Sequence, residues 1–471
     1  MGRLIVVSNR VPTPDKSGAQ AGGLAVALQT ALEARGGVWL GWSGNISEDA
    51  GLQVSKVGNI EYVLTDLTER DVDEYYRGFA NRVLWPICHY RLDLAEYGRK
   101  EMAGYFRVNR FFADQLLPQI REDDIIWVHD YHLIPLAAEL RKRGVTNRIG
   151  FFLHIPWPAP DVFYAMPVYE EILLNLASYD VVGFQTDTDR ENFADSVTRQ
   201  ALGHRIDDTN FEMAGRRFVA RSYPIGIETD KFARIAMRAS ISPIAKLMTE
   251  SLGGKDLIIG VDRLDYSKGI TQRIDAFERF LTKHTDIQRT VTLLQVTPKS
   301  RSDVPEYGAM QRALAEQAGR VNGGLGTVDW VPIRYVNRSL SRQGLAGLYR
   351  IAKAALVTPL RDGMNLVAKE YVASQNEDDP GVLILSRFAG AAHELSAALL
   401  VNPYDIEGTG DSIARALRMS LEERQERWRD MMSVLRRNDV FNWCSVYLAD
   451  LAEGRALHDE ATQAWTPARA S

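Results

Sequence analysis

The hydrophobic positions along the chain predict parallel β-sheets that are covered by helices. In the first half, short apolar runs rich in Val and Ile alternate with longer segments of helical period. Uninterrupted apolar runs are typical of strands that a parallel sheet buries on both faces. The predicted strands are Leu4–Ser8, Val38–Trp42, Ile125–His129, Ile149–His154 and Val181–Phe184. The predicted helices between them are Gly23–Ala34, Arg70–Leu84, Leu133–Arg143 and Tyr169–Ser178.

The same alternation returns in the second half, which indicates a second domain of the same kind. The predicted strands are Leu257–Asp262, Thr290–Val296, Ala355–Pro359, Val382–Leu385 and Leu399–Val401. The segment Thr229–Lys255 has helical character and no clear strand, so we place the domain boundary near residue 235. We therefore expect two doubly wound α/β domains, 1–235 and 236–453, followed by a mobile tail at 454–471.

The expected architecture also predicts where ligands bind. A chain of 471 residues is too long for one hydrophobic core, which agrees with two domains. In doubly wound sheets, ligands bind outside the carboxyl ends of the strands. Two such domains are expected to face a common cleft, and the polar residues that follow each apolar run become the candidates for chemistry.

Composition and charge narrow the classes of partner. Hydrophobic residues make up 45% of the chain and charged residues 25%, which are ordinary values for a globular protein. A formal net charge of −5 provides no basic surface, so neither nucleic acid nor an anionic membrane is an expected partner. Any anionic ligand must instead meet individually placed cations.

Cysteine usage and the N-terminus predict a cytoplasmic protein. Two cysteines, Cys88 and Cys444, are too few for a disulfide framework or a thiolate metal cluster. The apolar run in the opening MGRLIVVSNR is too short for a secretion signal. No uninterrupted apolar run approaches the roughly 20 residues that a membrane span requires.

Two loops of the second half carry candidate ligand-binding residues. After the strand in LIIGVDRLDYSKG, Arg263 and Lys268 could clamp a diphosphate and offset the charge that grows on it as it leaves. Alternatively they are solvated basic residues, one of them paired with Asp265. In LVTPLRDGMNLVAKE, Gly363 permits a tight turn before a helix whose first amides could bind an anion. Glu370, about one turn into that helix, could accept hydrogen bonds from ribose hydroxyls, or the segment is an ordinary strand–loop–helix connection.

The first half offers weaker single motifs. Arg10 closes the first strand, and Gly22-Gly23 opens a helix where a ligand could approach the backbone. No G-x-G-x-x-G or G-x-x-x-x-G-K-[ST] motif follows a predicted strand, which argues against a dehydrogenase, a kinase or an ATPase.

Polar clusters end two further strands, at HDYH (129–132) and at His154. Residues 129 and 130 would face opposite ways on a strand, so a metal site here is poorly supported. Asp130 and His154 could instead contact sugar hydroxyls, or they are structural. Tyr76, Trp85 and Arg301, taken singly, resemble core or surface residues.

Taken in order, these segments resemble the trehalose-6-phosphate synthase family, a retaining glycosyltransferase family with the two-Rossmann-domain architecture called GT-B. The resemblance covers about residues 1–453. It is carried by VSNR, AGGLA, GGVWLGWSG, DEYY…VLWP…HYR, WVHDYHL, FFLHIPWP, DVVGFQT, YPIGI, DRLDYSKG, TPLRDGMNLVAKEY and NPYD. Each motif alone is weak, whereas their common order is highly specific.

The resemblance implies a reaction and a role for each matching residue. A glucosyl group would pass from a nucleoside diphosphate glucose, expected to be UDP-glucose, to glucose 6-phosphate, giving α,α-trehalose 6-phosphate. Acceptor binding is implied for Arg10, Tyr76, Trp85, Arg301 and Asp130. Donor binding is implied for Gly22, Gly23, Arg263, Lys268 and the stretch Leu366, Val367 to Glu370. The transferred glucose would meet Asp362, Gly363, Met364, Asn365 and His154.

The resemblance also implies a front-face mechanism without an enzymic nucleophile, and neither a metal nor a cofactor is expected. Leu340 stands where relatives can carry Phe near the nucleobase, so the base preference stays open between UDP-, GDP- and ADP-glucose. Relatives often form dimers or tetramers, which predicts a homo-oligomer. A non-catalytic sugar-phosphate sensor and a nucleotide-sugar epimerase are the alternatives from other classes.

Overall fold

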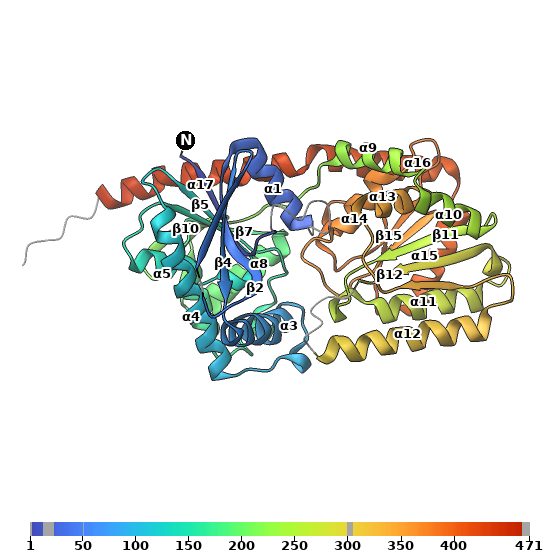
Figure 1. Ribbon diagram of the computed structural model, residues 1–471, viewed down its shortest axis with the longest axis horizontal. Helices are drawn as coiled ribbons and strands as arrows, with labels where there is room; N and C mark the ends of the chain where they lie inside the picture. The colour runs from blue at the N-terminus through green and yellow to red at the C-terminus, as the bar shows by residue number, and fades with distance from the viewer. Residues whose placement is uncertain (1, 13–22, 50, 299–304, 464–471) are drawn as a thin grey trace, which may run out of the picture. The chain divides into compact units, whose positions relative to one another are not determined.

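The computed structural model describes residues 2–12, 23–49, 51–298 and 305–463. By their contacts, the described residues separate into two compact units. The first contains 2–12, 24–49, 51–224 and 441–463, and the second contains Gly23, 225–298 and 305–440. Each unit is built around its own sheet, with helices packed on it (Figure 1).

A ten-stranded sheet forms the centre of the first unit. Its order is β3-β4-β2-β1-β5-β6-β7-β10-β9-β8, and the pairs from β4 through β10 are parallel. The strands are β1 (Leu4–Arg10), β2 (Gly37–Ile46), β3 (Leu52–Val57), β4 (Ile60–Leu67), β5 (Ile125–His129), β6 (Arg148–Phe152), β7 (Val181–Phe184), β8 (Gly203–Arg205), β9 (Asn210–Met213) and β10 (Arg216–Ser222). The five strands predicted from apolar runs are β1, β2, β5, β6 and β7, the buried middle of this sheet.

The strands that the sequence missed lie toward the two edges of this sheet. β3 runs antiparallel to β4, and β9 runs antiparallel to both β8 and β10. β3 is exposed along nearly its whole length, so it lacks the continuous apolar run of a central strand. The helices on this unit are α1 (Gly23–Arg35), α2 (Glu69–Asp71), α3 (Trp85–Cys88), α4 (Arg99–Leu116), α5 (Leu136–Lys142), α6 (Pro160–Phe163), α7 (Tyr169–Leu176) and α8 (Asp187–Arg199).

The second unit has a six-stranded sheet, entirely parallel, in the order β13-β12-β11-β14-β15-β16. Its strands are β11 (Asp256–Val261), β12 (Val291–Val296), β13 (Ile333–Val336), β14 (Ala354–Val357), β15 (Val382–Ser386) and β16 (Leu399–Val401). Its helices are α9 (Thr229–Ala239), α10 (Pro243–Leu252), α11 (Ile270–Lys283), α12 (Pro305–Leu325), α13 (Arg342–Ile351), α14 (Leu366–Ser374), α15 (Ile406–Arg418) and α16 (Leu421–Arg437). Ile258, Phe277, Leu293, Leu356 and Ile384 belong to one buried apolar cluster of strands and helices.

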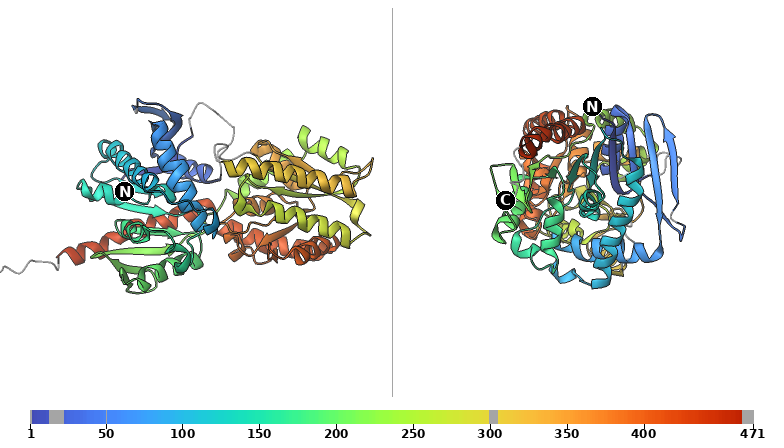
Figure 2. Two further views of the ribbon diagram at one scale, coloured as in Figure 1. Left: turned by 90° about the horizontal axis from the view of Figure 1, so that it is seen from below. Right: turned by 90° about the vertical axis from the view of Figure 1, so that its left-hand side faces the viewer.

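The last helix, α17 (Val440–Gln463), belongs to the first unit although it follows the second in sequence (Figure 2). The Tyr447 hydroxyl donates to the carbonyl of Phe151 at 2.9 Å. A side chain at Gly150 would meet that hydroxyl, since a Cβ there would lie 2.4 Å from it. The glycine therefore lets α17 pack closely against the sheet.

The units of the structure differ from the predicted domain limits. Residue 235 lies inside α9, and the described chain passes between the units at 23–24, 224–225 and 440–441. Hydrophobic periodicity shows that α17 has a buried face but not which sheet covers it. Within the segment 454–471, α17 continues to Gln463, and residues 464–471 lie outside the described residues.

Candidate active site

In the first unit, aromatic rings gather beside Arg10 at the carboxyl end of β1. The Arg10 guanidinium lies 5.9 Å from the centre of the Trp42 ring, a favourable cation–π distance. Tyr76 packs edge-on against Trp42 at 5.7 Å and stacks on His132 at 5.7 Å. A Cβ at Gly44, where φ is +92°, would lie 2.6 Å from an Arg10 nitrogen. The exposed Arg10 thus keeps its position because residue 44 has no side chain.

Tyr76 is carried by a π-helix, η1 (Val72–Leu84), where the sequence predicts an ordinary helix. π-Helical turns are rare in proteins as a whole, but many of those that occur lie at functional sites. Hydrogen bonds of 2.8 Å fix the segment at both ends: the Tyr75 hydroxyl donates to Asn9, and the Tyr131 hydroxyl donates to Asn81. Trp85 follows directly in α3, buried and 5.7 Å from the Tyr131 ring.

Asp130 has an unusual backbone conformation for a residue with a side chain. Its φ is +76°, a region that strains residues other than glycine and is frequent at functional sites. The amide of Asp130 donates to the carbonyl of Phe152 at 2.8 Å. The His154 amide donates to the Asp130 carboxylate at 3.3 Å. These two hydrogen bonds join the turn after β5 to the end of β6. Asp130 and His154, both predicted site residues, therefore lie next to each other.

His154 has two side-chain neighbours from adjacent strands. Its Nε2 lies 3.1 Å from Nδ1 of His129, and its Nδ1 lies 3.4 Å from the amide nitrogen of Gln185. Burial lowers the pKa of His154 to about 3. Burial, and then repulsion from His154, holds the pKa of His129 well below its usual range. Both rings are therefore uncharged near neutral pH.

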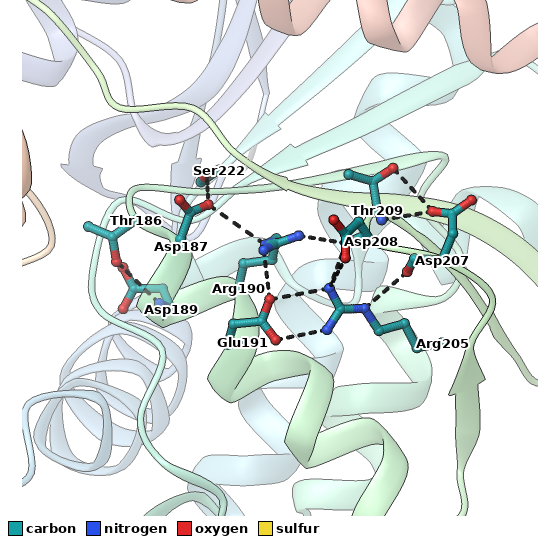
Figure 3. A network of polar contacts seen from close by, with 10 residues as sticks. All are labelled: Thr186, Asp187, Asp189, Arg190, Glu191, Arg205, Asp207, Asp208, Thr209 and Ser222. Atoms are coloured by element: carbon teal, nitrogen blue, oxygen red, sulfur yellow. Dashed lines mark hydrogen bonds and ion pairs between the residues drawn. The ribbon is translucent and has the colours of Figure 1, made fainter.

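The turn after Gln185 is held by hydrogen bonds around the start of α8 (Figure 3). Thr186 caps the helix by accepting from the Asp189 amide, and its hydroxyl donates to the Asp189 carboxylate at 2.6 Å. The other carboxylate oxygen of Asp189 accepts from the Trp157 amide at 2.9 Å. The segments that follow β6 and β7 are thus joined.

In the second unit, the two predicted loops meet through an ion pair. Lys268 lies in a short 3-10 turn, η5 (Tyr266–Lys268), after β11. Its Nζ lies 2.5 Å from the Asp362 carboxylate, and the Asn365 side chain donates to the same oxygen at 3.0 Å. Lys268 is 9% exposed, so its charge is held in a poorly solvated place. Arg263, in the same loop, is exposed.

The turn that carries Asp362 is fixed by its neighbours. Asn365 has a φ of +75°, and its side chain caps α14 by accepting from the Ala368 amide. A Cβ at Gly390 would lie 1.8 Å from the carbonyl oxygen of Gly363, so only glycine permits this approach. The Ala391 amide donates to the carbonyl of Met364 at 2.8 Å. The first residues of α14, Leu366 and Val367, are half-buried.

Glu370 lies in the second turn of α14 in a poorly solvated environment. Burial raises the pKa of its carboxyl to about 7, opposed by the positive charge of Arg342. Hydroxyl groups that donate hydrogen bonds to this carboxylate would favour its charged form. Glu370 can therefore bind a polyhydroxy ligand, but its charge lowers stability while the ligand is absent.

The raised pKa predicts a pH-dependent effect of Glu370→Gln. A carboxyl whose folded pKa exceeds its unfolded value loses its stabilising contribution as pH rises, here from about 4.5 to about 7. The glutamine does not titrate, so we expect the melting temperature of the variant, relative to the natural protein, to rise between pH 5 and pH 8. Thermal unfolding of both proteins across this range checks the prediction. Glu316→Gln, at an exposed position on α12, is the matched control, and identical curves for both variants would contradict the expectation.

A buried arginine that the sequence did not single out lies beneath the Lys268 loop. The Arg273 guanidinium is 2.7 Å from the Asp262 carboxylate, and both side chains are almost completely buried. It also donates to Thr358 at 3.0 Å and to Gln295 at 3.1 Å. Arg273 thereby joins the ends of β11, β12 and β14. An Asp directly after a buried strand was the available signal, but its partner lies on a helix.

The remaining predicted residues divide into described and undescribed positions. Gly23 begins α1, and Leu340 lies half-buried in the segment between β13 and α13. Gly22 and Arg301 lie outside the described residues. These clusters also contain three residues that the sequence did not indicate as site residues: Trp42, Gln185 and Arg273.

The described residues contain neither a metal-binding cluster nor a membrane-spanning helix. No group of three or more His, Cys, Asp or Glu side chains in the described part of the chain could hold a metal ion. Within 2–12, 23–49, 51–298 and 305–463, no helix is both long enough and apolar enough to cross a membrane.

Comparison with known proteins agrees with the fold. The model of glycosyltransferase family 20 matches residues 3–453. A trehalose-6-phosphate synthase of Sinorhizobium fredii is 65% identical over 456 residues, 96% of this chain and 98% of that protein.

Two solved structures have a similar fold and a bound ligand. A UDP-forming alpha,alpha-trehalose-phosphate synthase from Burkholderia xenovorans in complex with glucose-6-phosphate has a TM-score of 0.93 at 48% identity, covering 96% of this chain and all of that one. The E. coli structure bound with UDP-2-fluoro glucose has a TM-score of 0.91 at 47% identity, covering 96% and 99%.

Two Rossmann-like units with polar clusters at their strand ends define a GT-B glycosyltransferase, which confirms the predicted fold class. The chain belongs to glycosyltransferase family 20.

Proposed function

We propose that the protein transfers glucose from UDP-glucose to glucose 6-phosphate and releases α,α-trehalose 6-phosphate and UDP. The relatives that bind these two kinds of ligand cover nearly the whole chain. One observation on this chain carries the proposal. Lys268, nearly buried in the loop after β11, forms an ion pair with Asp362 in the turn before α14. A poorly solvated cation at this place suits a leaving diphosphate.

The donor residues that we propose lie in the second unit. Arg263 and Lys268 bind the diphosphate, the first amides of α14 at Leu366 and Val367 bind phosphate, and Glu370 accepts from the ribose hydroxyls. The glucosyl group meets the turn from Asp362 to Asn365. The helix start supports this assignment because its oriented amides favour an anion. Gly22 and Gly23 are proposed at the donor by resemblance, and Leu340 at the nucleobase.

The acceptor residues that we propose lie in the first unit. Arg10, and Arg301 by resemblance, pair with the phosphate of glucose 6-phosphate. Tyr76 and Trp85 frame the sugar, and Asp130 accepts from its hydroxyls. The cation–π contact of Arg10 and the fixed position of η1 support this assignment because they pre-organise the side chains before the ligand arrives.

The proposed chemistry retains the configuration at the donor carbon. The bond from C1 of glucose to the diphosphate oxygen breaks, and the acceptor hydroxyl attacks C1 from the same face. The hydroxyl proton passes to the departing diphosphate oxygen, and UDP leaves with the charge that Arg263 and Lys268 stabilise. Catalysis then consists of positioning and electrostatic stabilisation, without a covalent enzyme intermediate.

Release of UDP from UDP-glucose tests the proposal. With EDTA present, we expect UDP release that depends on glucose 6-phosphate, and a non-reducing disaccharide phosphate as product. Turnover with GDP- or ADP-glucose alone would change the donor and keep the reaction class. Donor binding without turnover on any nucleotide sugar would contradict the proposal. Cytoplasmic location and a dimeric or tetrameric state stay predictions, and gel filtration with light scattering measures the second.

A further inference from the structure

Glu74 is a charged side chain buried where η1 packs against α4. The side chain of Glu74 is 1% exposed, and glutamates are almost never buried unless they are paired. Arg107 of α4 lies 2.7 Å from one carboxylate oxygen, and Arg70 donates to the other at 2.9 Å. Lys100, also on α4, lies 3.5 Å from the carboxylate. A buried charge of η1 is thus paired with cations of the neighbouring helix.

Arg107 also holds the residue that precedes η1. Its Nε and Nη2 donate to one carboxylate oxygen of Asp71 at 3.0 and 2.6 Å, and the Thr68 hydroxyl donates to the other at 2.8 Å. The two helices approach closely here, because a Cβ at Gly104 would lie 2.2 Å from Cβ of Glu74. Arg107 therefore joins both the start and the first turn of η1 to α4.

Three successive residues of η1 face three different surroundings. Glu74 faces α4. The Tyr75 hydroxyl donates to Asn9, the next-to-last residue of β1, at 2.8 Å. The Tyr76 ring packs edge-on against Trp42. Turning η1 about its axis by one residue position would therefore replace Tyr76 beside Trp42 with one of its neighbours.

The apolar pattern alone does not select this arrangement. The pattern of 70–84 predicts an ordinary helix, whereas the segment 72–84 forms the wider π-helix. The two forms turn the same side chains in different directions, so the register of η1, meaning which side chain faces which neighbour, must be fixed by other contacts. A buried ion pair contributes little to stability compared with apolar side chains of similar volume, and its best-attested use is to fix register.

We propose that Glu74 and Arg107 are positioning residues that hold η1 in its π-helical register and thereby place Tyr76 beside Trp42 and Arg10. The contacts that carry this inference all lie in the first unit. Its consequence for glucose 6-phosphate rests on the proposed function, in which Tyr76 binds the acceptor. Neither Glu74 nor Arg107 needs to touch the ligand, because both act through Tyr76.

Replacing both residues with methionine separates register from stability. Glu74→Met combined with Arg107→Met exchanges the ion pair for apolar side chains, so we expect the melting temperature to stay close to that of the natural protein. The amides of 72–84 are expected to exchange hydrogen about tenfold faster or more, because the loss of charge-assisted hydrogen bonds favours local opening. Hydrogen exchange with mass spectrometry on the whole protein measures this without any ligand. Unchanged exchange in 72–84 would overturn the proposal.

Two single variants keep the test decisive if the double variant does not fold. Glu74→Gln keeps the length of the side chain and an acceptor for Arg107, so we expect slow exchange in 72–84. Glu74→Asp keeps the charge but is shorter by one methylene, which withdraws the carboxylate from Arg107, so we expect faster exchange there. Exchange in the aspartate variant that is as slow as in the glutamine variant would contradict the proposed role of the pair.

Steady-state kinetics test the consequence for the acceptor. In the double methionine variant, KM for glucose 6-phosphate is expected to rise about three- to tenfold, the effect of one misplaced aromatic contact. KM for UDP-glucose should stay unchanged, because the proposed donor residues lie in the second unit. An equal rise in both KM values, or no rise for glucose 6-phosphate, would overturn the link between the pair and Tyr76.

Arg143→Met is the matched control, because it breaks ion pairs at the other end of α4. Arg143 pairs with Asp114 of α4 at 2.8 Å and with Glu139 at 3.0 Å. We expect natural exchange in 72–84 and a natural KM for glucose 6-phosphate, and the same changes as in the double variant would refute a specific role of Glu74 and Arg107. Absence of acceptor-dependent UDP release in the natural protein would refute the proposed function, whereas the exchange measurement would still decide whether the pair holds η1.

Discussion

Replacing Lys268 with alanine is expected to lower kcat by about 10²- to 10³-fold, the usual effect of removing one group that stabilises transition-state charge. Lys268 is almost buried and paired with Asp362, so water compensates poorly for its loss. Because diphosphate charge grows as the glucosyl bond breaks, the deficit should appear in kcat more than in KM for UDP-glucose. Steady-state UDP release at saturating glucose 6-phosphate measures both.

Two further variants show whether the lost charge causes the lower kcat. Lys268→Arg keeps the positive charge and is expected to recover part of kcat. The recovery is partial because the planar guanidinium of arginine differs in shape from the lysine ammonium. Lys283→Ala removes a lysine that pairs with Asp411 at the surface of α11 and should leave kcat unchanged. Asn365 still donates to Asp362 without the lysine, but breaking a poorly solvated ion pair lowers stability. Thermal unfolding is therefore measured for each variant, and kcat is compared well below the melting temperature. A Lys268→Ala enzyme with natural kcat would refute the diphosphate assignment.

Arg273→Met is expected to lower the free energy of unfolding by about 3–5 kcal/mol, the typical result of removing one partner from a buried ion pair. The loss arises because the buried Asp262 carboxyl group loses its ion-pair partner. Burial already raises the pKa of Asp262 against the opposing effects of Arg273 and Lys268. Urea denaturation at pH 7 measures the change. A methionine variant as stable as the natural protein would mean that the pair contributes nothing.

The pair also predicts a rescue and a pH dependence. Asp262→Asn combined with Arg273→Met removes the unpaired charge and is expected to recover a large part of the lost stability. Without Arg273, the pKa of Asp262 should rise further, so the single variant should lose stability relative to the natural protein as pH increases from 5 to 8. Arg320→Met, which breaks the exposed pair with Glu278, is the matched control and should change the stability little, because solvent screens exposed pairs.

The central strands and the second-unit loops were predictable from the sequence because their signals are local. β5, β7 and β16 have the predicted bounds, since a strand buried on both faces appears as one apolar run. The segments that contain Lys268 and Asp362 to Glu370 each follow such an apolar run directly. Their position after a predicted strand made them candidates for ligand binding. Their motifs, taken together and in order, also indicated the family that the comparisons establish.

The pairing of distant residues was decided only by the tertiary structure. Lys268 and Asp362 are 94 residues apart, and His129 and His154 are 25 apart. The periodicity of a segment reports how it is buried, but it carries no information on strand order, register or the partner across the sheet. For the same reason the sequence alone left open the edge hairpins, the π-helical form of η1 and the return of α17 to the first sheet. Strand order and register place His129, His154 and Gln185 in one row.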